Sequence, residues 1–128
     1  MKTNLIDYAV EILTYLNKKY TLHIITNGFQ EVQFSKLLAN HLLQYFKQVI
    51  TSEKAGIQKP DKKIFEYSVS KARAEFDESI YIGDSWEVDI MGAKNAGMDQ
   101  VYFNPEKKKN IIDATYEISS LRELEKLF

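Results

Sequence analysis

The chain has 128 residues, no cysteine, and 17 basic against 18 acidic side chains, which gives a formal net charge of −1. This length suits one domain, and the balanced charge provides no field that would attract nucleic acid or an anionic membrane. The lack of cysteine excludes disulfides, thiol catalysis and zinc–thiolate sites. No apolar run approaches the roughly 20 residues that span a bilayer, so we expect a cytoplasmic protein with no nucleic-acid or membrane partner.

The first half of the chain predicts helix, strand, helix and strand. Apolar side chains recur at helical spacing in two stretches, and each stretch precedes a short run rich in β-branched residues. The first of these runs ends in Thr26-Asn27-Gly28, a sequence that breaks a strand. The predicted helices span about 4–19 and 34–42, and the predicted strands span 20–25 and 46–51.

The second half continues the alternation. Asp61 can cap a helix that starts at Lys62, Gly97 closes a helix of small residues, and Ser120 has capping-box spacing to Glu123 for a terminal helix. Strands that alternate with helices predict an α/β fold with a parallel, doubly wound sheet. The predicted strands span 79–82 and 100–103, and the predicted helices start at about 62, 88 and 121.

Three motifs place polar side chains where predicted strands end or a helix begins. A carboxylate at the carboxyl end of a parallel strand stands where α/β enzymes carry their chemistry. The segment from Tyr81 to Asp89 has this form, because an apolar run stops at Gly83-Asp84 before a turn and a helix. The other two motifs are Thr26-Asn27-Gly28, at the end of an apolar run, and Gln58-Lys59-Pro60-Asp61, just before a helix.

In this order, the motifs resemble the second, third and fourth motifs of the haloacid dehalogenase-like (HAD) hydrolases. Most members of that superfamily are Mg²⁺-dependent phosphatases with a Rossmann-like core. The resemblance therefore implies a Mg²⁺ cofactor and a small phosphorylated metabolite as substrate. It runs from about Leu22 to about Pro105, and the segment Val101-Tyr102-Phe103-Asn104-Pro105 is most similar to the pyrimidine-nucleotidase branch.

The resemblance implies a metal site at Asp84 and Asp89. The carboxylate of Asp84 would be a hard ligand of the kind that Mg²⁺ prefers, alongside several waters. Alternatively, Asp84 only caps the helix that follows Gly83. Asp89 would either ligate the metal or support the site from a second layer, and otherwise it complements the helix dipole.

The resemblance also implies that Thr26, Asn27, Gly28 and Lys59 bind the phosphoryl group. Thr26 would donate its hydroxyl and backbone N–H, with Asn27 beside it, and Gly28 permits close backbone approach. Lys59 would place an ammonium against the phosphate and the nucleophile, so Lys59 and Thr26 are the predicted catalytic residues. Outside this context, Thr26-Asn27-Gly28 would be a strand-ending turn and Lys59 a surface lysine.

The chain departs from the family at the first motif. That motif is Asp-x-Asp, it carries the nucleophilic aspartate, and it should precede the other three. No two aspartates in this chain are two positions apart, and the family's helical cap is missing too. We therefore expect residues 1–128 to be a partial HAD core, the C-terminal portion of a full hydrolase, which by itself turns over no phosphate ester.

The missing motif would also bring the central strand of the sheet. In the family fold, that strand lies between the strand that ends at Thr26 and the strand that ends at Gly83. Its loss predicts two half-sheets, and unpaired strand edges at the centre would bury unsatisfied backbone groups. We expect the half-sheets to close together, or a missing N-terminal segment, a swapped segment or a second copy in a homo-oligomer to fill the gap.

Two functions remain open at this point. The chain is either part of an HAD-like phosphatase, with nucleoside monophosphates as one substrate class, or an inactive truncated core that serves as a binding or interaction module. A receiver-like phosphoacceptor that uses Asp84 fits poorly, because it needs an acidic cluster at the end of its first strand as well.

Overall fold

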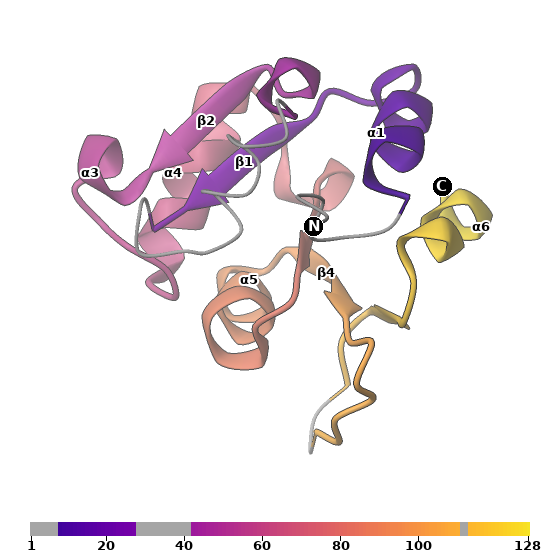
Figure 1. Ribbon diagram of the computed structural model, residues 1–128. Helices are drawn as coiled ribbons and strands as arrows, with labels where there is room; N and C mark the ends of the chain where they lie inside the picture. Colours follow the sequence, from indigo (N-terminus) through magenta and orange to yellow (C-terminus); the bar gives the residue numbers. More distant parts are fainter. Residues whose placement is uncertain (1–7, 28–41, 111–112) are drawn as a thin grey trace, which may run out of the picture.

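The computed structural model describes residues 8–27, 42–110 and 113–128. Along these residues helices and parallel strands alternate, as the apolar spacing predicts (Figure 1). The strands are β1 (His23–Thr26), β2 (Gln48–Thr51), β3 (Ile80–Gly83), β4 (Asp99–Phe103) and β5 (Tyr116–Ile118). The helices are α1 (Ala9–Asn17), α3 (Ser52–Ala55), α4 (Lys62–Ala72), α5 (Met91–Ala96) and α6 (Leu124–Leu127), with short turns at η2 (Leu43–Tyr45), η3 (Phe76–Glu78), η4 (Trp86–Ile90) and η5 (Leu121–Glu123).

The strands form two parallel sheets. β1 pairs with β2, so that Thr26 lies opposite Thr51. β3, β4 and β5 form the second sheet in that order, with Gly83 opposite Tyr102. Within the described ranges, no backbone pairing joins β1 to β3. The protein thus has an α/β, Rossmann-like fold in two half-sheets, as expected of an HAD core without its central strand.

Two apolar clusters form the core. The first joins β2, α4 and α5, and it receives Ile25 from β1 and Tyr81 from β3. The second joins α1, β4, β5 and α6. Side-chain packing therefore connects the two half-sheets where backbone pairing does not. The buried members are Ile50, Ile64, Phe65, Val69, Ala93 and Met98 in the first cluster, and Ile12, Leu16, Val101, Ile118 and Leu124 in the second.

Helix α4 begins at the predicted residue. The Asp61 carboxylate accepts the backbone N–H of Lys63 at 2.9 Å, which satisfies one of the donors that a helix start leaves without a partner. Ile64 and Phe65 then point into the first cluster and are fully buried. The cap and the apolar face together fix where the segment after Pro60 turns into the core.

The helical segment after β3 begins two residues before the predicted Val88. The Ser85 side chain accepts the backbone N–H of Val88 at 3.4 Å, and the first turn, η4, is π-helical. Single π turns occur often at functional sites. The segment ends as predicted at Gly97, whose φ of 92° is costly for residues with a Cβ.

The C-terminal capping box is also confirmed. The backbone N–H of Ser120 donates to Oε2 of Glu123 at 2.9 Å, and the Ser120 hydroxyl accepts in return from the first turn. That turn is a 3-10 helix, η5, and α6 follows it. The cap thereby positions Leu124, which is buried in the second cluster.

The short elements β5 and α3 were not predicted. β5 has three residues, too few for a clear alternation of apolar and polar side chains. α3 is a single turn that starts at Ser52 and ends at Gly56. The predicted helix over 34–42 lies outside the described residues except for Leu42, which is buried. Among the residues described, no helix is both long and apolar enough to cross a membrane.

Candidate active site

Predicted site residues lie at the carboxyl ends of β1 and β3. Thr26 is the last residue of β1 and is 3% exposed. Asn27 follows it, and Asp84 follows the last residue of β3 with its side chain exposed. Gly28 lies outside the described residues, so its predicted phosphate contact stays a prediction.

Lys59 links these two strand ends. Its ammonium donates to Oδ1 of Asp89 at 2.7 Å, and the two side chains are only 3% and 6% exposed. Its backbone is held as well, because its N–H donates to Oδ1 of Asn27 at 3.0 Å and its carbonyl accepts from Nδ2 of Asn27 at 3.3 Å. The Lys59–Pro60 peptide bond is cis. The structure thus brings Asn27, Lys59 and Asp89 together, and Lys59 is not the surface lysine of the alternative interpretation.

The Asp89 carboxylate accepts several hydrogen bonds. Its Oδ1 accepts a hydrogen bond from the Lys59 ammonium. Its Oδ2 accepts hydrogen bonds from the backbone N–H groups of Asp84 at 3.3 Å and of Ser85 at 3.1 Å. A carboxylate with several such donors is held in one orientation. Asp89 therefore fixes both the Lys59 ammonium and the loop that carries Asp84.

The residue before Asp84 must be small. A Cβ built on Gly83 would lie 2.4 Å from Cβ of Asp89 and 2.6 Å from its Cγ and Oδ2. Real side chains do not approach so closely, so any larger residue at this position displaces Asp89. The Gly-Asp pair in the motif is thus explained by the close approach of the Asp89 side chain to the β3 backbone.

Tyr81 also belongs to this site, although its local sequence did not predict it. Its hydroxyl lies 3.1 Å from Nζ of Lys59, 3.2 Å from Oδ1 of Asp89 and 3.3 Å from the carbonyl oxygen of Ile25. The ring packs edge-on against Phe65 with 5.2 Å between centroids. The available signal was weak: a tyrosine in a strand with an apolar body and a polar tip that requires a partner when buried.

The carboxylates at this edge suit Mg²⁺ that is held largely by water. Asp84 is exposed, and four donors lie within hydrogen-bonding distance of the Asp89 carboxylate. In the described part of the chain, no three His, Cys, Asp or Glu side chains gather in a cluster that could hold a metal. Mg²⁺ commonly uses one or two carboxylates, with waters and substrate phosphate as the other ligands. If Mg²⁺ binds at this edge, Asp84 would be its carboxylate ligand and Asp89 would support the site.

Other conspicuous side chains stay outside this cluster of contacts. The pKa of His23 on β1 lies below its ordinary value because of burial and the nearby charge of Lys47, and Nδ1 of His23 is buried without a hydrogen-bond partner among the described residues. Trp86 packs on the ring of Tyr102, with 5.2 Å between centroids. Lys54 is exposed in α3. Their surroundings indicate structural or solvent-exposed roles.

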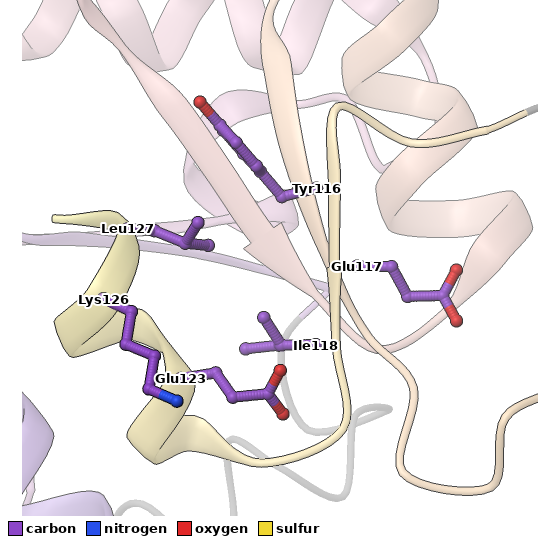
Figure 2. Close-up of a pocket in the computed structure, with 6 residues that line it drawn as sticks. All are labelled: Tyr116, Glu117, Ile118, Glu123, Lys126 and Leu127. Atoms are coloured by element: carbon purple, nitrogen blue, oxygen red, sulfur yellow. The ribbon is translucent and has the colours of Figure 1, made fainter.

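A pocket lies at the β5 edge of the second sheet, between β5 and the C-terminal helical turns (Figure 2). Its volume of about 160 Å³ is below the roughly 300 Å³ at which small-molecule sites begin. Glu117 points away from the helix and accepts a hydrogen bond from Asn104 at 2.9 Å. None of the predicted site residues lines this pocket, which is formed by Tyr116, Glu117, Ile118, Glu123, Lys126 and Leu127.

The chain matches a known protein family. A family profile described as haloacid dehalogenase-like hydrolase matches residues 1–103. The chain belongs to this family. The resemblance carried by the three motifs is thereby confirmed, and so is the fold class that it implies.

Relatives of this HAD hydrolase include phosphatases and nucleotidases. The HAD-hydrolase YfnB of Bacillus subtilis is 37% identical over 123 residues, which cover 94% of this chain and 52% of YfnB. The pyrimidine 5'-nucleotidase YjjG of Escherichia coli is 36% identical over 93% of this chain and 54% of its own length. A glyceraldehyde 3-phosphate phosphatase of Methanothermobacter thermautotrophicus is 33% identical over 84% of this chain and 52% of its length.

The solved structure of YfnB bound to magnesium agrees with the fold. It matches with a TM-score of 0.88 and 36% identity over 98% of this chain and 56% of the YfnB chain. The HAD chain described here thus spans about half the length of the relatives it matches. The two half-sheets of this chain correspond to part of the larger YfnB fold.

Proposed function

We propose that this chain forms the phosphate-binding part of a Mg²⁺-dependent HAD phosphatase that acts on small phosphomonoesters. The observation that carries the proposal is the buried pair of Lys59 and Asp89, with 2.7 Å between Nζ and Oδ1. Apolar side chains of similar volume often stabilise a core at least as well as a buried ion pair. A role in binding an anion therefore explains the pair better than stability does.

Each site residue has a role in this proposal. The Lys59 ammonium and the Thr26 hydroxyl stabilise the negative charge on the phosphoryl oxygens. Asn27 holds the Lys59 backbone, and Asp89 holds its ammonium. Asp84 carries Mg²⁺, which when bound neutralises further charge on the phosphate.

The nucleophile is outside this set of residues. Because the sequence has no Asp-x-Asp motif, we predict that the chain alone binds phosphate without multiple turnover. Two relatives suggest substrate classes to compare: YjjG is a pyrimidine 5'-nucleotidase and the Methanothermobacter protein is a glyceraldehyde 3-phosphate phosphatase. We favour nucleoside monophosphates, because Val101 to Pro105 is most similar to the pyrimidine-nucleotidase branch.

Titration calorimetry with inorganic phosphate tests the proposal. The wild-type chain should bind phosphate more tightly with Mg²⁺ than without it. Lys59→Met should weaken binding by about tenfold or more, the usual effect of losing a hydrogen bond from a charged group. Asp84→Asn should abolish the effect of Mg²⁺, whereas Lys54→Ala, which removes an exposed lysine, should leave binding unchanged.

Equal phosphate binding by the wild type and Lys59→Met would overturn the proposal. Absence of binding by the wild type would favour the alternative function, an interaction module without catalysis. A second assay measures phosphate release from uridine monophosphate and glyceraldehyde 3-phosphate. Mg²⁺-dependent release that Asp84→Asn abolishes would show that the chain contains a nucleophile and would refute its predicted inactivity.

A further inference from the structure

The proposed function assigns no role to the hydroxyl of Tyr81, which lies among three polar groups from separate parts of the chain. The Lys59 ammonium donates to it at 3.1 Å. Its single proton has two acceptors within reach, Oδ1 of Asp89 at 3.2 Å and the carbonyl oxygen of Ile25 at 3.3 Å. Tyr81 therefore connects the lysine and its partner carboxylate to the backbone of β1.

Contacts at both ends hold the Tyr81 side chain in place. Its ring meets the fully buried ring of Phe65 at 87° and 5.2 Å, the edge-to-face arrangement that aromatic pairs favour. The hydroxyl end is fixed by Ile25, the residue before Thr26. One side chain on β3 thus spans the two half-sheets, which share no backbone pairing in the described residues.

A second hydrogen-bond acceptor for the Lys59 ammonium matters because the lysine side chain is flexible. Lysine has a long flexible stem and loses much rotamer freedom when it is fixed. With Asp89 as its sole acceptor, the ammonium would still rotate about its bond to that carboxylate. The Tyr81 hydroxyl removes this rotation and so fixes the orientation of the ammonium. Nζ also lies 5.7 Å from the Tyr81 ring centroid, which is within cation–π range, and the hydroxyl at 3.1 Å makes the closer contact.

We infer that Tyr81 is a positioning residue for the phosphate-binding lysine: its hydroxyl orients the Lys59 ammonium toward the phosphoryl group and ties it to the end of β1. The inference rests on the proposed function of Lys59. Tyr81 acts through the lysine and requires no contact with the substrate.

The test uses Tyr81→Phe, which removes the hydroxyl and keeps the ring against Phe65. In the wild type, the ¹H–¹⁵N signal of the Lys59 ammonium should be observable and slow to exchange with water, with an NOE to the Tyr81 ring protons. In Tyr81→Phe, this signal should broaden or exchange faster. The dissociation constant for inorganic phosphate should rise roughly 3- to 10-fold, the range for one hydrogen bond. Tyr102→Phe, a buried tyrosine of β4, is the matched control and should change neither readout.

A double-mutant cycle separates positioning from a general structural role. In the Lys59→Met background, Tyr81→Phe should have no further effect on phosphate binding, because the group it positions is gone. The inference is overturned if the Lys59 signal and phosphate binding are unchanged in Tyr81→Phe, if the wild type shows no NOE between the two side chains, or if the effect persists in the Lys59→Met background. Failure of the proposed function looks different: the wild type binds no phosphate, while the ammonium signal and its NOE remain.

Discussion

The buried pair of Lys59 and Asp89 allows a quantitative test by mutation of both partners. Lys59→Met keeps the aliphatic stem and removes the charge, so that the Asp89 carboxylate, 6% exposed, keeps only uncharged donors. These are the Tyr81 hydroxyl and the backbone N–H groups of Asp84 and Ser85. Breaking a buried pair from one side costs about 3–5 kcal/mol of unfolding free energy, because it leaves a buried charge without its counter-ion. Asp89→Asn should cost a similar amount by stranding the ammonium.

The double variant gives the distinctive result. Lys59→Met combined with Asp89→Asn leaves no buried charge, and an amide oxygen at position 89 can still accept from the loop. The double variant should therefore be more stable than either single variant, although it changes more atoms. This order follows from desolvation, because a neutral pair needs no compensation for the loss of water.

Urea denaturation at pH 7 measures all four proteins. Trp86, the single tryptophan, packs on Tyr102 beside the site loop and reports unfolding by fluorescence. With a urea dependence of about 2 kcal/mol/M, each single variant should lower the midpoint by roughly 1.5–2.5 M. Lys54→Met, an exposed lysine, should leave the midpoint unchanged. If the losses of the two single variants simply add in the double variant, the side chains are not coupled and the reasoning is refuted.

Three further predictions concern single positions. Gly83→Ala should displace the Asp89 side chain, whose Cβ would lie 2.4 Å from the new methyl group, and should weaken phosphate binding as strongly as Lys59→Met; unchanged binding would contradict the close approach. The lowered pKa of His23 means that the unfolded chain takes up a proton below about pH 6.5 that the folded chain resists. Stability should therefore fall with pH below that value, and His23→Gln should flatten this part of the urea midpoint profile; an unaltered profile would exclude His23 as its source. Ser120→Ala should cost about 1 kcal/mol of unfolding free energy through loss of the cap, measured by the same urea assay with Ser119→Ala for comparison.

Local chemistry in the sequence predicted the ends of elements well. Asp61, Gly97 and Ser120 interact with backbone groups only a few residues away, so the neighbouring sequence was sufficient to predict them as helix caps. Short patterns also singled out Lys59 and Asp84, whose roles in binding phosphate and Mg²⁺ stay predictions. The two half-sheets followed from the missing first motif.

Contacts between distant segments could not be read in the same way. Asn27 and Lys59 are 32 positions apart, and Tyr81 and Ile25 are 56 positions apart. No periodicity or spacing in the sequence indicates that Asn27 clamps the Lys59 backbone, or that the Tyr81 hydroxyl reaches β1. These contacts depend on how two half-sheets pack through a shared apolar cluster, which becomes visible only in the folded chain.

The central claim is that the ends of β1 and β3 bind a phosphoryl group through Lys59. A crystal structure of the chain grown with Mg²⁺ and tungstate, a tetrahedral oxyanion, tests it most directly. The account predicts tungstate within hydrogen-bonding distance of Nζ of Lys59 and the hydroxyl of Thr26, with Mg²⁺ beside Asp84. Tungstate bound elsewhere, with no density beside Lys59, would contradict it.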